Sequence, residues 1–177
     1  MKKNLFPFLA LLILIFPACQ EQIDVEKEKQ AIITVLNEES QAYLDRDYER
    51  LAACWVQDSL TRRLNASRTG YSFTAWEEMS NNIKEGLAND SLWLNYKDMK
   101  YAKSDFIIKV FTDCAWATYN EKLTGLWQDE PFETEAIHLT VLEKIDEQWK
   151  ISAFSMITTT SYEEVEAEEP AEEESEE

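Results

Sequence analysis

The sequence predicts an α+β domain in which three N-terminal helices pack on a strongly curved antiparallel sheet. Apolar residues recur at helical spacing up to about Leu87, and from Leu92 onward apolar and polar residues alternate at strand spacing. Helices followed by a meander of strands are typical of α+β domains, whose sheet needs helices to cover one face. The expected core, residues 26–162, has a length that suits one domain.

Three helices are expected in the first half of the chain. The first runs from about Val25 to Leu44, and its buried face is predicted from the spacing of Ile32, Val35, Leu36, Glu39 and Tyr43. The second is short, from Tyr48 to about Trp55, with Asp47 as its N-cap. The third opens at Thr74, because Thr74 and Glu77 have the spacing of a capping box.

The strands follow the helices, with one exception. Residues 59–66 are expected to form a short strand between the second and third helices. The later strands are expected at residues 93–96, 106–111, 114–127, 133–145 and 149–162. Turn residues separate them at Asp113, at 129–131 and at 146–148.

Three segments carry a resemblance to a known family. Residues 42–48 read AYLDRDY, residues 51–58 read LAACWVQD, and residues 147–152 read EQWKIS. In this order, the segments supply an aspartate after the first helix, an aromatic residue that ends the second, and a Trp-basic-Ile start to the last strand. The chain resembles the nuclear-transport-factor-2-like superfamily, which includes SnoaL-like polyketide cyclases and ketosteroid isomerase.

The resemblance implies a cone-shaped fold, a cystatin-like α+β roll whose sheet curls around a pocket, and a homodimer formed through the outer face of the sheet. Members of the superfamily include enzymes and non-catalytic ligand binders, so the fold alone does not assign chemistry. In the isomerase branch a carboxylate on the first strand removes a proton, and Arg63 stands near that position. A guanidinium cannot serve as a base. The oxyanion-donating tyrosine aligns near Glu39, with Tyr43 one turn away, so a steroid-type isomerase is disfavoured.

Glu121 and Tyr119 are candidate catalytic residues because they lie two apart and face the same side of a strand. If that side lines the pocket, a desolvated Glu121 has a raised pKa and can act as a general base. The alternative is a surface carboxylate beside Lys122. His138, the only histidine, is either a catalytic assistant or a hydrogen-bonded structural residue, and one imidazole does not make a metal site.

The expected ligand-contacting residues are Tyr43, Arg63, Trp76 and Trp116. Arg63 belongs to a local cluster with Arg62 and Arg68, and arginine forks suit a ligand carboxylate or sulfate. Pairing with neighbouring acids is an equal alternative for these arginines. The tryptophans are core candidates first, and one or two are expected to wall an apolar pocket. No cofactor and no metal are expected.

The N-terminus has the layout of an export signal. Lys2 and Lys3 precede an apolar run that is too short to span a bilayer and that ends at Cys19. Residues 1–18 resemble a bacterial lipoprotein signal peptide, which implies a lipid on Cys19, a tether over residues 19–25 and attachment to a membrane of the cell envelope, on its periplasmic or outer-membrane face. The alternative is ordinary cleavage that leaves Cys19 a free thiol.

Charge excludes one class of partner. Removal of residues 1–18 leaves fifteen basic and thirty-five acidic residues, a net charge of −20. Nucleic acid is not an expected partner, because a phosphate backbone needs clustered basic residues. Residues 163–177 hold ten glutamates and no basic residue, the composition of a solvated acidic tail.

Cys54 and Cys114 are too few and too far apart for a zinc motif. They are expected either to pair in an oxidising compartment or to remain two buried thiols.

Three functions fit these observations. The first is a lipid-tethered module that binds a small apolar or anionic ligand without catalysis, and it is preferred because the catalytic positions of known relatives are not preserved. The second is a hydrolase, dehydratase or isomerase that uses Glu121 with Tyr119 or His138. The third is an envelope assembly protein that uses the sheet face.

Overall fold

The computed structural model describes residues 23–67 and 70–159. The expected signal peptide, the lipidation candidate Cys19 and the acidic tail at 163–177 lie outside the described residues. Within the described ranges, no helix is both long enough and apolar enough to cross a membrane.

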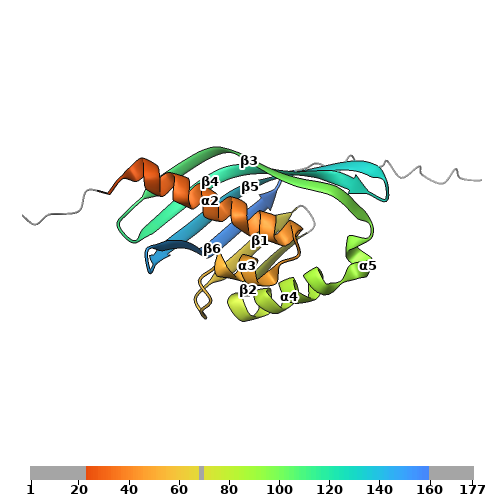
Figure 1. Ribbon diagram of the computed structural model, residues 1–177, viewed down its shortest axis with the longest axis horizontal. Helices are drawn as coiled ribbons and strands as arrows, with labels where there is room; N and C mark the ends of the chain where they lie inside the picture. The colour runs from red at the N-terminus through yellow and green to blue at the C-terminus, as the bar shows by residue number, and fades with distance from the viewer. Residues whose placement is uncertain (1–22, 68–69, 160–177) are drawn as a thin grey trace, which may run out of the picture.

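The described residues before Leu94 form four helices (Figure 1): α2 Val25–Leu44, α3 Tyr48–Ala53, α4 Trp76–Ala88 and α5 Asp90–Trp93. Asp24 caps α2 by accepting a hydrogen bond from the backbone of Lys27. Asp47 caps α3 in the same way by accepting from Arg50 N, as the sequence predicts. These caps set the starts of α2 and α3.

Six strands form one sheet: β1 Arg62–Ser67, β2 Gly70–Ala75, β3 Tyr96–Val110, β4 Cys114–Trp127, β5 Glu130–Ile145 and β6 Gln148–Thr158. Their order in the sheet is β2-β1-β6-β5-β4-β3. The four later strands form the expected antiparallel meander. The prediction of a helix-covered curved sheet is confirmed, with the difference that β1 pairs with β6 in parallel.

The region before α4 differs most from the prediction. The single strand expected at 59–66 is one arm of a hairpin, β1 with β2. Thr74 pairs with Arg63 in this hairpin, and α4 begins two residues later without a side-chain cap. The predicted capping box of Thr74 and Glu77 is therefore wrong, because the backbone of Thr74 belongs to the sheet.

The strands expected at 93–96 and 106–111 are also corrected. Trp93 ends α5, and β3 runs from Tyr96 to Val110. The register of β3 against β4 shifts at two places, and Asp98 and Asp105 have positive φ angles of 52° and 56° there. Such bulges insert a residue and reverse the alternation, so the pattern of one long strand reads as two short ones.

The helices lie on the concave face of the sheet (Figure 1). Between them is a core of fully buried side chains, among them Ile32, Leu36, Leu51, Trp55, Leu142 and Ile151. Leu139 and its neighbours on the other face have none of the described helices over them. The sheet thus has one covered and one uncovered face.

The two cysteines of the described chain, Cys54 and Cys114, are free thiols, so the expected alternative of a bridge is not adopted. Burial raises the pKa of Cys54 to about 12. A thiol so hard to ionise is a structural rather than a reactive group.

Candidate functional site

A cavity of about 520 Å³ lies among α2, α4 and the concave face of the sheet. Its wall combines apolar side chains with a larger number of polar ones. Its main polar groups are Glu39, Ser40 and Tyr43 of α2, Arg63 and Asn65 of β1, Tyr101 of β3 and Glu121 of β4. The fold thus brings one face of the first helix opposite three strands that are distant from it in the sequence.

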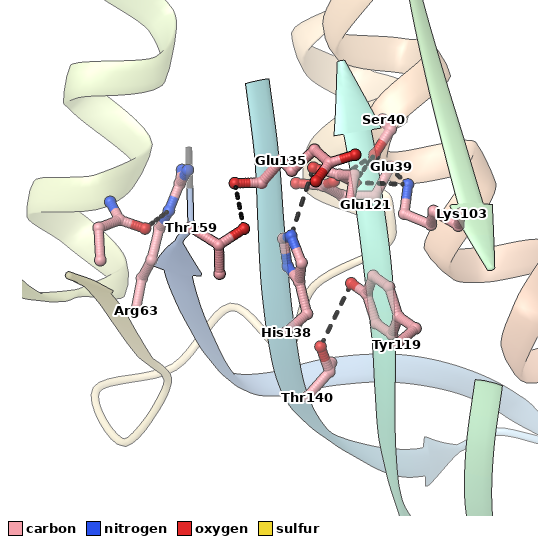
Figure 2. A network of polar contacts seen from close by, with 11 residues as sticks. Glu39, Ser40, Arg63, Lys103, Tyr119, Glu121, Glu135, His138, Thr140 and Thr159 are labelled. Carbon is pink, nitrogen blue, oxygen red and sulfur yellow. Dashed lines mark hydrogen bonds and ion pairs between the residues drawn. The ribbon is translucent and has the colours of Figure 1, made fainter. Parts of the chain in front are cut away.

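A buried ion pair lies at one side of the cavity (Figure 2). Lys103 Nζ is 3.0 Å from Glu121 Oε2, and the two side chains are only 3% and 11% exposed. Lys103 also donates a hydrogen bond to the hydroxyl of Ser40, which in turn lies 3.5 Å from Glu121 Oε2. Lys103 and Glu121 face each other directly across β3 and β4, so the register of these two strands forms the pair.

His138 lies behind Glu121 and is 1% exposed. Its Nε2 is 3.4 Å from Glu121 Oε1, a polar contact that does not meet the geometry of a hydrogen bond and is an ion pair only when the imidazole is protonated. Its ring stacks on Tyr119, with centroids 4.7 Å apart, and meets the edge of Phe154. The aromatic neighbours hold the imidazole in place, and it does not line the cavity.

The environment of Glu121 overturns two expectations. The side chain lies in the cavity wall, so the alternative of a surface carboxylate beside Lys122 is wrong. Burial raises the pKa of Glu121, but His138 and Lys103 together outweigh burial and bring the pKa below its ordinary value. The expected raised pKa is therefore wrong as well, because the sequence did not reveal the cation on the neighbouring strand.

Arg63 is the cation that faces the cavity. Its Nε donates a hydrogen bond of 3.2 Å to Asn65, and its guanidinium lies 5.4 Å from the ring centroid of Phe154. Among residues 23–67 and 70–159, no carboxylate lies within ion-pair distance of it. Within these residues, Arg63 therefore does not pair with a neighbouring acid. The remaining N–H donors of its guanidinium are available to a ligand.

Two tyrosines stand near this guanidinium. Burial raises the pKa of Tyr43, and the positive charge of Arg63 opposes that shift. Burial likewise raises the pKa of Tyr101, again with Arg63 acting in the opposite direction. Both phenols are thus neutral hydrogen-bonding groups in the cavity wall at neutral pH.

The other predicted site residues do not line the cavity. Trp76 packs against Trp55, with ring centroids 6.3 Å apart. Trp116 is 37% exposed on the uncovered face of the sheet, because its neighbours Ala115 and Ala117 occupy the covered face. Tyr119 is buried between Phe106 and His138. The ligand-contacting roles predicted for Trp76 and Trp116 do not fit these positions.

Sequence reasoning missed Lys103, Ser40 and Tyr101. Lys103 and Tyr101 fall between the two bulges of β3, where the alternation does not read as a strand. Ser40 lies on the buried side of α2, next to Glu39. Its position at helical spacing from Leu36 and Tyr43 is the signal that could have placed it in the site.

The chemical capacity of the site follows from these contacts. Within the described residues, no group of three or more His, Cys, Asp or Glu side chains is placed to hold a metal ion. Ser40 accepts a hydrogen bond from Lys103, and its own hydroxyl proton has the carboxylates of Glu39 and Glu121 as acceptors, at 3.4 and 3.5 Å. Glu121 is a stabilised carboxylate rather than a strong base.

No protein-family model matches the sequence, and no curated protein matches it. Solved structures do match the fold. A nuclear transport factor 2 (NTF2-like) superfamily protein from Salmonella enterica superposes with a TM-score of 0.61 at 15% identity, over 80% of this chain and 98% of that chain. An NTF2-like protein from Cytophaga hutchinsonii gives a TM-score of 0.54 at 19% identity, over 73% of this chain and 97% of that chain.

The domain has the nuclear-transport-factor-2-like fold. The fold implied by the sequence resemblance is thereby confirmed. A hexachlorocyclohexane dehydrochlorinase also superposes, with a TM-score of 0.58 at 18% identity, over 77% of this chain and 88% of that chain. An enzyme is thus among the structures that share this fold. At such identities the similarity extends to the fold, and the chemistry has to be argued from this cavity.

Proposed function

We propose that this protein is a lipid-anchored cell-envelope protein whose NTF2-like domain binds a small ligand without catalysing a reaction. The observation that supports it most is the guanidinium of Arg63, which faces the cavity with no acidic partner among the described residues. A partly desolvated cation without a partner is costly. A ligand carboxylate or sulfate would relieve this cost through the arginine fork.

The rest of the wall fits the apolar body of such a ligand. Apolar side chains from the helices and the sheet line the cavity beside the polar groups, among them Leu51, Met79, Ile83, Leu123, Phe154 and Met156. The volume, about 520 Å³, lies in the range of small-molecule sites. An apolar ligand with one anionic group matches this combination.

The state of Glu121 supports binding rather than catalysis. A general base works best when its pKa lies near the working pH. The pKa of Glu121 is instead lowered below its ordinary value and so moved away from neutral pH. His138 and Lys103 favour the charged carboxylate, and their effect exceeds that of burial. The second candidate, a hydrolase, dehydratase or isomerase that uses Glu121, is favoured by one observation, the position of this carboxylate in the cavity wall.

The first test of binding is native mass spectrometry of the protein purified from an exporting bacterial host. We expect a mass excess that disappears on denaturation, and we expect Arg63→Met to lose it. Removing one partner of a buried charged contact typically costs 2–5 kcal/mol, so occupancy should fall by more than about tenfold.

The matched control is Arg62→Met. The Arg62 side chain donates to the backbone carbonyls of Ser59 and Thr61 and does not line the cavity. Its substitution should leave the mass excess unchanged. Equal loss in both variants, or turnover of an added ester, alkyl halide or enone that Glu121→Gln abolishes, would contradict the binding function.

Membrane attachment is proposed through Cys19, which follows the apolar run 5–16. Intact-mass spectrometry of protein from the membrane fraction should show residues 1–18 removed and a lipid mass on Cys19. Cys19→Ser should move the protein into the soluble fraction. The same distribution for both forms would count against lipid anchoring. Because α2 holds 20 residues and rises about 1.5 Å per residue, the cavity lies roughly 20 Å along α2 from the tethered end.

A homodimer is proposed through the uncovered face of the sheet. Its exposed apolar side chains are Ile107, Trp116, Ile137, Leu139, Val141 and Ile157. They are neighbours in the ladder, since Trp116 faces Val141 and Ile137 faces Ile157. A contiguous apolar patch of this kind marks an interaction surface. The same patch supports the third candidate, in which another envelope protein binds this face.

A further inference from the structure

We propose that the cavity selects ligands that carry a positively charged group as well as an anionic one, with Glu39 receiving the positive group and Arg63 the anionic one. This inference rests on the proposed binding function. It goes beyond that function because it names a small zwitterion, rather than a simple anion, as the ligand class.

The charges of the cavity wall are the first step. Among the described residues, three carboxylates line it, those of Glu39, Glu78 and Glu121, against the single guanidinium of Arg63. Glu121 is neutralised from behind by Lys103, which does not itself line the cavity. Glu78 is exposed on α4 and has access to water. Glu39 is therefore the carboxylate whose charge inside the cavity needs a partner.

No described cation contacts Glu39 directly, and its link to Lys103 runs through the hydroxyl of Ser40. Glu39 is half-buried on α2, and its side-chain hydrogen-bond partner is the hydroxyl of Ser40, at 3.4 Å from Oε2. Within residues 23–67 and 70–159, no lysine, arginine or histidine lies within 4 Å of its carboxylate. Its neighbour Glu38 differs, because Glu38 pairs with Arg50 on the outer side of the helix.

Glu39 and Arg63 share the cavity without pairing with each other. Both act on the same side chain, since the charge of Arg63 lowers the pKa of Tyr43 and that of Glu39 raises it. Two opposite charges held apart in a partly desolvated space each lack compensation. A ligand that bridges them compensates both, whereas an anion alone satisfies Arg63 and is repelled by Glu39.

The test compares matched probes by isothermal titration calorimetry on the soluble Cys19→Ser protein. The first set is 4-(aminomethyl)benzoate, 4-methylbenzoate and 4-methylbenzylamine. They share one ring, and they carry both charged groups, the carboxylate alone and the ammonium alone, respectively. The second set is phenylalanine, 3-phenylpropanoate and phenethylamine, with a shorter separation of charges. In at least one set we expect the zwitterion to bind at least tenfold more tightly than either singly charged probe.

Three variants test which residues cause the preference for the zwitterion. Glu39→Gln should bring the zwitterion and the anion to similar affinity, and Arg63→Met should bring the zwitterion and the amine to similar affinity. Glu38→Gln, one residue away and outside the cavity, should leave the preference unchanged.

Anions that bind as tightly as the zwitterions in both sets would overturn the inference and leave the binding function intact. Absence of binding by every probe at millimolar concentration would also overturn the inference, and the binding function would then be judged by the co-purified mass excess. A preference that survives Glu39→Gln would overturn the role of Glu39.

Discussion

Lys103→Met is expected to lower the free energy of unfolding by about 3–5 kcal/mol at neutral pH, because it leaves the buried carboxylate of Glu121 without its cation. Methionine keeps the length of the aliphatic chain, so lost packing contributes little. Urea denaturation, followed by tryptophan fluorescence, measures the change. A loss below about 1 kcal/mol would show that water or rearrangement compensates Glu121.

The matched control for this change is Lys122→Met on the next strand. Lys122 is 43% exposed and pairs with Glu133 and Glu135 at the surface. Exposed pairs of this kind contribute about 0–1 kcal/mol. A comparable loss in both lysine variants would mean that burial is not what distinguishes Lys103.

The effect of Lys103→Met depends on pH in a defined direction. Because the folded pKa of Glu121 lies below its ordinary value of 4.5, its contribution to stability is present above that value and is lost as the pH falls through the folded pKa. In the variant, burial without Lys103 favours the protonated carboxyl. The difference between wild type and Lys103→Met should therefore narrow from pH 7 toward pH 4, and a constant difference would contradict this account.

Leu139→Lys is expected to convert the proposed dimer into a monomer at micromolar concentration. Leu139 is 48% exposed at the middle of the apolar patch on the uncovered face, between Ile137 and Val141 of β5. A lysine there would bring two like charges toward each other and desolvate them at the interface. Sedimentation velocity measures the change in mass.

Asn81→Lys on the exposed side of α4 is the control, since it adds the same charge away from the sheet. It should leave the dimer intact. A wild-type protein that is already monomeric, or a Leu139→Lys protein that stays dimeric, would remove the sheet-face dimer.

Helices α2 and α3 were predictable because their signals are local. Asp47 caps α3, and the apolar spacing on α2 marks its buried face, both within a few residues of sequence. Long strands with regular alternation, such as β5, were equally readable, as Ala136, His138 and Thr140 are buried while the residues between them are exposed. The hairpin of β1 and β2 was not, since strand pairing depends on residues across the sheet.

The candidate site was predictable only in part. Tyr43, Arg63 and Glu121 were singled out from the sequence and do line the cavity. Lys103 was missed because a bulge in β3 hides its strand, and the pairing of Lys103 with Glu121 depends on the register of β3 against β4. The side of the sheet on which Trp116 lies was likewise undetermined without that register.

The sequence by itself determined the class of the fold, the acidic character of the chain and the residue types available to a site, because composition and short-range periodicity are properties of neighbouring residues. Only the tertiary structure decided the charge state of Glu121, the separation of Arg63 from any described acid and the uncovered face of the sheet. These depend on which side chains of distant segments meet and on how far water is excluded there.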